Sequence, residues 1–312
     1  MKKSQILFFI TFICILFISI FVIFNKKESS SPTSNDKPTE ERLSKGSGRV
    51  GYGMLGKDNK IIDSGSVLKD ITNGKIDSKV TLNSYINNDR KYKILVMNNF
   101  RQVQFEANGN EDKSHEFLAK ANTTVDTAIS NKIDTDTKEV AYLMIKDPDL
   151  LIEKLDLDKA GTVQQVLPLR YSLENETIPH YQYESVAPLK TSSEDPIDNV
   201  FISETEDELI ALMSAESGQE VYLTVGNPTD EVMDYALVSF LDWEQVPLIN
   251  EEVVLYVTVN PNEKKVFQLK LPETDKKKNY QVLAFPFPYK TSFENFESHT
   301  VEGTFRTVIK PK

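Results

Sequence analysis

Apolar and polar side chains alternate along much of the second half of the chain. The run Val221 to Gly226 places Val, Leu and Val between Tyr, Thr and Gly, and Val254–Val259 and Val266–Leu271 have the same period of two. This alternation is typical of a strand with one buried face. Turn-forming residues separate the runs, as in Asn227-Pro228-Thr229-Asp230 and Asn260-Pro261-Asn262. Short strands at this spacing predict an antiparallel β-sandwich.

The first half repeats this pattern in the same order, at an offset of about 140 residues, which is the length of a whole domain. The matching segments are Tyr92–Val96 with Tyr235–Ser239, Phe100–Val103 with Trp243–Val246, Tyr142–Ile145 with Val282–Phe285, Pro148 with Pro288, and Thr162-Val163 with Thr300-Val301. The sequence therefore predicts an all-β protein with two sandwich domains, one over residues 49–174 and one over residues 175–312.

Two segments have features of a helix. Glu204–Ser214 follows Ser203, which forms a capping box with Glu206. The second segment is the short run Asp149–Leu157.

An uncharged apolar run, Ile6–Phe24, lies near the amino terminus. At about 1.5 Å per residue it is long enough to cross a hydrocarbon core of about 30 Å. The residues that follow it offer no small side chain for signal cleavage, and Cys14 is preceded by Ile13 rather than by the small residue of a lipoprotein signal. We therefore expect an uncleaved transmembrane anchor at residues 6–24, after a cytoplasmic tail at residues 1–5.

Residues 25–48 are rich in serine, proline and charge, which predicts a flexible linker because such a stretch cannot bury enough apolar surface to become ordered. Lysines flank both ends of the anchor, so the charge bias that sets orientation is weak. Acidic residues follow only on the distal side, which favours a cell-membrane protein whose bulk lies outside the cytoplasm.

The composition excludes several classes of function. The 312 residues carry a formal net charge of −11, which disfavours nucleic acid as a partner because nucleic-acid binding needs a basic surface. A single cysteine excludes an intrachain disulfide framework and a cysteine-based zinc site. No cofactor is expected.

Motifs of known catalytic classes are absent or incomplete. The histidines His115, His180 and His299 form no His-Glu-x-x-His pair. Ser66-Val67-Leu68-Lys69 lacks the companion motifs of penicillin-binding enzymes, and the glycines from Gly46 to Gly51 follow a polar linker rather than a strand. No catalytic or metal-binding residue is therefore assigned.

Three pairs of acidic residues leave calcium binding open: Asp134 with Asp136, Asp147 with Asp149, and Asp156 with Asp158. None of them continues into a complete calcium loop, so solvated surface carboxylates are the simpler interpretation. Paired carboxylates that cleave a glycan also stay open, because their separation depends on the fold.

Two groups of aromatic residues are candidates for different roles. Trp243 and its counterpart Phe100 each follow an alternating run, which predicts a place in the core. The prolines in Phe285-Pro286-Phe287-Pro288-Tyr289 predict an edge or a loop. If Phe285, Phe287 and Tyr289 are exposed there, they are the best candidate for a surface that binds a partner.

The second half resembles bacterial immunoglobulin-like modules of cell-surface proteins. The resemblance rests on Gly226-Asn227-Pro228-Thr229, Tyr235–Val238, Trp243, Val257–Glu263 and Phe267–Pro272, and both cysteines of antibody domains are missing. Together with the anchor and the repeat, it resembles membrane-anchored surface proteins of low-GC Gram-positive bacteria with tandem immunoglobulin-like sandwiches.

This resemblance implies location and architecture. We expect a binding or scaffolding protein without catalytic activity, attached to the membrane through residues 6–24, with a protein or cell-wall partner. The alternatives are a cell-envelope hydrolase that uses paired carboxylates and an accessory subunit of a membrane complex.

Overall fold

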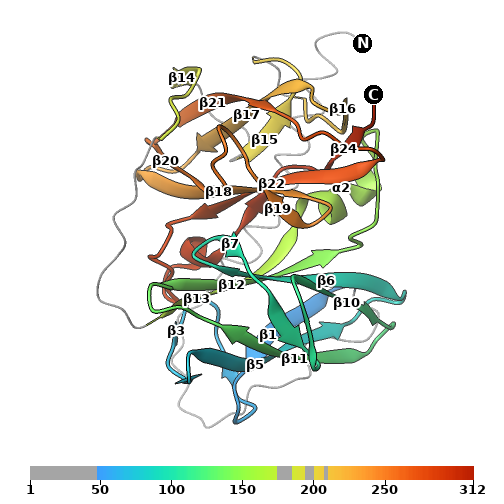
Figure 1. Cartoon of the computed structure of the whole chain (residues 1–312), viewed down its shortest axis with the longest axis vertical. Coiled ribbons are helices and arrows are strands. Elements are labelled where there is room, and N and C mark those ends of the chain that lie inside the picture. Colours follow the sequence, from blue (N-terminus) through green and yellow to red (C-terminus); the bar gives the residue numbers. More distant parts are fainter. Residues whose placement is uncertain (1–47, 174–184, 194–199, 207–209) are drawn as a thin grey trace, which may run out of the picture. The chain divides into compact units, whose positions relative to one another are not determined.

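A computed structural model describes residues 48–173, 185–193, 200–206 and 210–312. The predicted anchor at residues 6–24 and the predicted tail lie outside the described residues, as does the linker apart from Gly48. No helix in the described part of the chain is long and apolar enough to span a membrane. The described residues all belong to one compact unit (Figure 1).

The first sandwich consists of two sheets, called here A and B. Sheet A has the order β2 (Ile61–Ile62), β1 (Val50–Leu55), β5 (Lys75–Ser84), β11 (Thr124–Lys132), β8 (Phe105–Ala107) and β9 (Asn110–Asp112), with β4 (Ile71–Thr72) beside β5. Sheet B has the order β10 (Ser114–Ala119), β6 (Arg90–Asn98), β12 (Glu139–Lys146), β13 (Val166–Leu173) and β3 (Val67–Leu68), with β7 (Arg101–Gln102) beside β6.

Sheets C and D form the second sandwich. Sheet C has the order β14 (Lys190–Ser192), β21 (Glu263–Lys270), β17 (Glu220–Asn227) and β15 (Val200–Ser203). Sheet D has the order β16 (Ser214–Glu216), β24 (Thr307–Lys310), β22 (Lys278–Pro286), β18 (Met233–Leu241) and β19 (Glu244–Val246), with β20 (Leu255–Val259) beside β18 and β23 (Glu302–Gly303) beside β22. The predicted all-β architecture is therefore confirmed, and its pairing is antiparallel apart from β13 with β3 and β16 with β24, which pair parallel.

Each sandwich encloses its own apolar core. Between sheets A and B lie, among others, Met54, Val80, Leu82, Tyr92, Ile94, Val96, Ile129, Val140, Tyr142 and Met144. Between sheets C and D lie Val221, Leu223, Val225, Tyr235, Leu237, Leu255, Val257, Phe267, Leu269 and Val282. These side chains occupy alternate positions along their strands, as the period of two predicts.

A third apolar cluster joins sheet B to sheet D, and we call it the inter-sandwich cluster. It contains Leu95, Met97, Phe100, Ala141, Leu143, Ile145, Val166, Ala236, Val238, Phe240, Trp243, Val254, Leu283 and Phe285. Strands β6, β12, β18 and β22 are therefore buried on both faces, which explains their continuous apolar runs. The last strand of the first sandwich ends at Leu173, and the first strand of the second sandwich begins at Lys190. The inter-sandwich cluster unites the two sandwiches in one compact unit.

The internal repeat is present in the backbone as well as in the sequence. Two tight turns match: Asn99 and Phe100 have φ of 48° and 62°, and Asp242 and Trp243 have φ of 47° and 73°. The Asn99 amide donates to the Glu139 carbonyl at 2.9 Å. At the matching turn, the Asp242 amide donates to the Asn279 carbonyl at 2.8 Å. Positive φ at both central positions suits the twist of a two-residue hairpin.

The helix predicted over Glu204–Ser214 is wrong for the residues of that segment that the structure describes. Residues 204–206 and 210–213 are not helical, and Ser214 begins β16. The Leu212 amide donates to the Ile202 carbonyl of β15 at 2.9 Å, and the Thr307 hydroxyl donates to the Leu212 carbonyl at 2.7 Å. Tertiary pairing with two strands thus overrides the local capping signal.

The second predicted helix is displaced along the chain. Helix α2 (Leu157–Gln164) begins where the predicted run Asp149–Leu157 ends. Asp156 is its N-cap, with a side chain that accepts from the Asp158 amide at 3.1 Å. A short 3-10 helix, η2 (Phe296–His299), occupies the matching connector of the second sandwich.

Two glutamines link the sandwiches through reciprocal hydrogen bonds. The Gln102 amide donates to Gln245 Oε1 at 2.7 Å, and the Gln245 amide donates to Gln102 Oε1 at 2.8 Å. Their Nε2 atoms donate to the carbonyls of Trp243 and Phe100, at 2.9 and 2.8 Å. The repeat units therefore meet as the subunits of an isologous dimer do, with the same surface used twice.

We expect Gln102→Ala and Gln245→Ala each to lower the free energy of unfolding by about 1–3 kcal/mol, because each leaves a partly buried amide of the other repeat without its acceptor. The double variant should lose about the sum of the single losses, because each substitution removes only the hydrogen bonds of its own side chain and leaves the main-chain amide at its own position able to donate. Urea denaturation of the three variants measures the losses, and a double variant no less stable than either single one would contradict this account.

Candidate functional site

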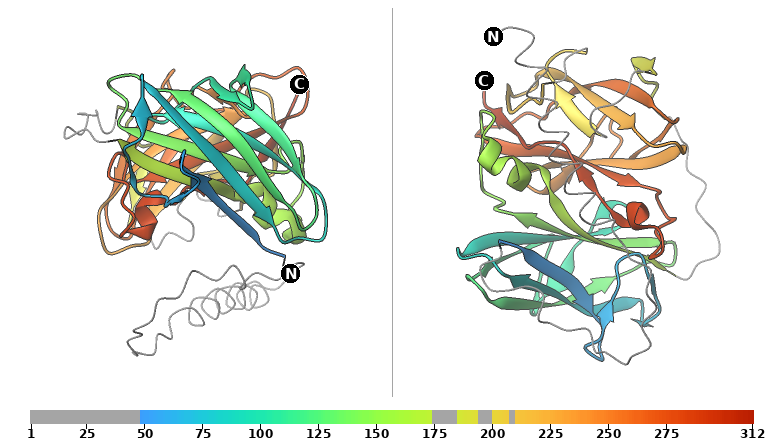
Figure 2. Two further views of the ribbon diagram at one scale, coloured as in Figure 1. Left: turned by 90° about the horizontal axis from the view of Figure 1, so that it is seen from below. Right: turned by 180° about the vertical axis from the view of Figure 1, so that it is seen from behind.

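The connectors of each sandwich pack on the other sandwich. Helix α2, which leads into β13, lies against the second sandwich, where the Arg306 amide donates to the Val163 carbonyl at 3.0 Å. The segment around η2 lies against the first sandwich. There, a Cβ on Gly65 (φ +88°) would come within 2.6 Å of the Ser292 carbonyl carbon. Figure 2 shows both contacts, with the green α2 beside the red carboxyl-terminal strands and the red η2 beside the green β13.

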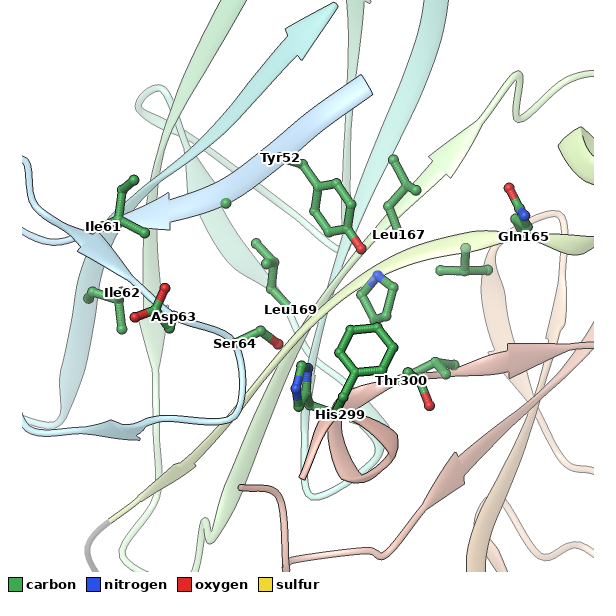
Figure 3. Close-up of a pocket in the computed structure, with 15 residues that line it drawn as sticks. Tyr52, Ile61, Ile62, Asp63, Ser64, Gln165, Leu167, Leu169, His299 and Thr300 are labelled. Carbon is green, nitrogen blue, oxygen red and sulfur yellow. The ribbon is translucent and has the colours of Figure 1, made fainter. Parts of the chain in front are cut away.

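A cavity of about 470 Å³ lies where the η2 segment covers the first sandwich, and we call it the first cavity (Figure 3). Four segments line it: Tyr52-Gly53 of β1, Ile61–Ser64, Gln165–Leu169 at the start of β13, and Phe296 with His299–Val301. The first three segments belong to the first sandwich, where β1 and β2 pair, and only the crossing connector brings Phe296 and His299–Val301 from the second half of the chain beside them.

The lining of the first cavity is largely apolar, and part of its rim is exposed. Ile61 and Phe296 each expose 71% of their surface, whereas Leu169 and Val166 are buried. The Tyr52 side chain extends from β1 toward Leu167 (Figure 3). Large apolar side chains exposed beside a concave apolar surface mark a candidate binding site.

Ser64 and His299 also line the first cavity. The Ser64 hydroxyl accepts from the Arg170 amide at 3.0 Å and donates to the Arg170 carbonyl at 3.5 Å. Its hydrogen-bonding capacity is thus directed at the backbone of β13, which gives Ser64 a positioning role. The His299 ring contacts Phe296 edge to face, with centroids 5.0 Å apart. Partial burial lowers the pKa of His299, and the positive charge of Arg170 lowers it further.

This lowered pKa predicts a pH dependence of stability. Below its usual pKa of about 6.5, the unfolded chain binds a proton at His299 more readily than the folded chain does. The free energy of unfolding should therefore fall as the pH drops from 8 toward 5, and His299→Gln should make this fall shallower. Urea denaturation across that range measures the slope, and an unchanged slope in His299→Gln would contradict the prediction. His115→Gln should make the fall shallower as well, because burial also lowers the pKa of His115, which lies in β10.

A second cavity of about 470 Å³ is more polar. Its lining includes Asp134 and Asp136 from the first sandwich and Glu252, Tyr256 and Tyr289 from the second. The hydroxyls of Tyr256 and Tyr289 lie 2.7 Å apart, and burial raises the pKa of Tyr256 to about 12, which keeps this phenol neutral at physiological pH.

The other predicted acidic pairs have identifiable structural partners. Asp147 pairs with Arg90 at 3.1 Å, and Asp149 pairs with Lys91 at 2.5 Å. Asp156 caps α2 and lies 2.9 Å from Lys159. Within the described ranges, no group of three or more His, Cys, Asp or Glu side chains is placed to hold a metal ion.

Phe100 and Trp243, the predicted core aromatics, are both buried. They lie in the inter-sandwich cluster, rather than between the two sheets of their own sandwiches. The Trp243 indole donates to the Pro148 carbonyl at 2.9 Å, and the Arg306 guanidinium lies 4.7 Å from the ring centroid. They are therefore structural contacts of the interface between the repeats.

The predicted aromatic surface is wrong for Phe285, which is fully buried. Phe285 lies within β22, opposite Ala236 of the central strand β18, because the alternate prolines begin only at the last residue of β22. The Phe287 side chain packs against the core of the second sandwich, and Tyr289 packs against the inter-sandwich cluster. The aromatic side chains of this motif therefore contribute to packing inside the protein. His180, the third histidine, lies outside the described residues.

No protein-family model matches the chain, and no curated protein is significantly similar to it. Among solved structures, the chain is similar to a red sea bream transglutaminase, with a TM-score of 0.23 and 9% identity over 85% of this chain and 32% of that one. It is also similar to the carboxyl-terminal domain of the Streptococcus agalactiae AgI/II polypeptide BspA, with a TM-score of 0.22 and 10% identity over 84% of this chain and 100% of that one.

A third similarity is to the Salmonella enterica SafA pilin in complex with the SafB chaperone, with a TM-score of 0.23 and 13% identity over 78% of this chain and 91% of that one. Scores this low carry no argument about function. The β-sandwich architecture rests on the strand pairing and the three apolar clusters.

Proposed function

We propose that the chain is a membrane-anchored extracytoplasmic protein that binds or scaffolds a partner and has no catalytic activity. The observation that carries this proposal is the first cavity, whose lining is largely apolar and whose exposed rim, with Ile61 and Phe296, offers contact surface for a partner. Its serine is directed at the backbone of β13, and its histidine contacts Phe296.

The anchor and the orientation come from the sequence pattern. The uncharged run at Ile6–Phe24 supports a single-pass anchor, and the polar residues after it support a stalk. The resemblance to immunoglobulin-like modules of Gram-positive surface proteins supports an extracellular location. Two sandwiches joined by a buried interface suit a protein that presents one fixed surface at a distance from the membrane.

Protease treatment of intact cells tests the orientation, since an outward-facing ectodomain should be degraded along with a known external protein. Survival of residues 50–312 beside a degraded external control would overturn it. Full-length chain used as bait on solubilised membranes should then retain a specific partner. Replacing Ile6–Phe24 with an unrelated apolar span should leave that partner bound, and its loss would instead support an accessory subunit whose anchor makes specific contacts.

A second candidate function is a cell-envelope hydrolase, which the second cavity favours because carboxylates from both sandwiches line it. Asp134 and Glu252 would then supply the paired carboxylates of glycan hydrolysis. Cleavage of purified wall glycan by the full chain, abolished in Asp134→Asn and in Glu252→Gln, would establish this function. Absence of cleavage by the unmodified chain would support the binding protein.

A further inference from the structure

The two repeats differ in how completely their crossed connectors close the partner sandwich. On the second sandwich, α2 closes the opening with an apolar cluster of Ile152, Val163 and Met213, against which Leu150 and Phe305 pack. A Cβ on Gly303 would lie 2.6 Å from the Gln164 carbonyl oxygen, so α2 fits closely there. On the first sandwich, the η2 segment leaves the first cavity.

Two arginines establish that these places are equivalent. Arg170 donates to the carbonyls of Pro286 and Thr300, at 2.8 and 3.2 Å. Arg306 donates to the matching carbonyls of Lys146 and Thr162, at 2.6 and 3.3 Å. The residues that precede these arginines therefore correspond: Phe305 belongs to the closed apolar cluster, and Leu169 lines the first cavity. The closed repeat shows which chemistry fills the open one, namely large apolar side chains.

One strand edge beside the first cavity lacks a strand partner among the residues that the structure describes. On the side away from β5, β1 pairs with β2 only through Met54 and Leu55, so Val50 to Gly53 has no strand partner on that side within the described ranges. The facing edge of β13 is less suitable, because Pro168 has no amide to donate and the Arg170 amide and carbonyl already bond to Ser64 and Gly65. An added strand would therefore pair with β1.

We propose that the first cavity binds an extended peptide segment of a partner protein, which adds to the free edge of β1 and inserts a bulky apolar side chain between Tyr52, Leu169 and Phe296. The inference rests on the proposed binding function and specifies the partner's chemistry. Main-chain hydrogen bonds to Val50 and Tyr52, which face away from β5, supply the docking, and the cavity selects the apolar side chain, as in other cases of strand addition.

Selection of random displayed peptides on the immobilised full chain tests the inference. The enriched peptides should carry a leucine, methionine, isoleucine or phenylalanine within a run of β-forming residues. A synthetic copy should slow amide hydrogen exchange at Val50 and Tyr52, whose amides point away from β5, whereas those of Gly51 and Gly53 face β5. Enriched peptides without a bulky apolar residue, or binding without protection of β1, would overturn it.

Substitutions of residues that line the first cavity provide a second test. Leu167→Trp places a larger side chain in the cavity and should lower the affinity for the selected peptide about tenfold or more. Leu118→Trp, at an exposed leucine of β10, should leave this affinity unchanged. Ile61→Ser removes an exposed rim side chain without disturbing a core and should weaken binding in the same direction. Equal affinity of Ile61→Ser and the unmodified chain would contradict the proposed site.

These experiments also distinguish a failure of the inference from a failure of the proposed binding function on which it rests. If full-length Leu167→Trp, folded as judged by its circular dichroism, still retains the partner captured by the unmodified chain, the cavity is not the binding site although the binding function stands. If the unmodified chain enriches no peptide, the inference fails irrespective of what the bait experiment retains. Peptide-independent self-association blocked by Ile61→Ser would identify a second copy as the occupant and overturn the proposal.

Discussion

Arg170→Met is expected to lower the free energy of unfolding by about 3–5 kcal/mol, because it removes one partner of a buried ion pair. Arg170 and Glu139 are both buried, and Arg170 Nε lies 2.7 Å from Glu139 Oε1. The guanidinium also donates to the Pro286 and Thr300 carbonyls of the second sandwich. The substitution leaves the Glu139 carboxylate without its cation in a site that excludes water. Urea denaturation followed by the fluorescence of Trp243, the only tryptophan of the chain, measures the loss.

A double variant and a surface variant separate this explanation from a simple loss of packing. Arg170→Met with Glu139→Gln should be more stable than Arg170→Met alone, because no unpaired charge stays buried, and the glutamine oxygen can still accept from the Tyr289 amide. Lys60→Met breaks an exposed pair with Asp58 and should leave the unfolding curve unchanged. If the double variant is as unstable as the single one, the buried charge is not the cause.

Local and periodic features of the fold were accessible from the sequence. Period-two alternation predicted the β-strands. The collinear matches paired Phe100 with Trp243 and Pro148 with Pro288, and the members of each pair occupy corresponding turn positions in the two repeats. The continuous apolar runs at Tyr142–Ile145 and Val282–Phe285 carried a further signal, since strands buried on both faces lack alternation. Those runs could have predicted that the two sandwiches pack face to face.

The candidate site was beyond the reach of sequence reasoning for a physical reason. Tyr52, Ile61, Leu167 and Phe296 come from four segments, and none of them belongs to a motif with a fixed spacing. Phe296 reaches the other three because its connector crosses from the second sandwich to the first, which is a property of tertiary packing. The misassigned helix over Glu204–Ser214 has the same origin, because bonds to β15 and β24 outweigh a local cap.

Trp243→Ala is expected to lower the free energy of unfolding by about 3–5 kcal/mol, the usual cost of truncating a buried large aromatic side chain. The indole fills the inter-sandwich cluster and lies beneath the Arg306 guanidinium. Alanine would leave a cavity between sheets B and D, because the neighbouring side chains of the cluster cannot fill the volume of the indole. Because the indole contributes to the interface of both repeats, we expect a single transition at lower urea, measured by circular dichroism.

Trp243→Phe tests which part of the indole matters. The phenyl ring keeps most of the apolar contact and loses the donor to Pro148, whose carbonyl still accepts from Asn279 Nδ2 at 3.1 Å. No buried acceptor is then left without a partner, so the loss should be about 1 kcal/mol, well below that of alanine. If phenylalanine costs as much as alanine, the hydrogen bond rather than the apolar contact holds the sandwiches together at this point, and a melting curve unchanged by alanine would remove Trp243 from the core altogether.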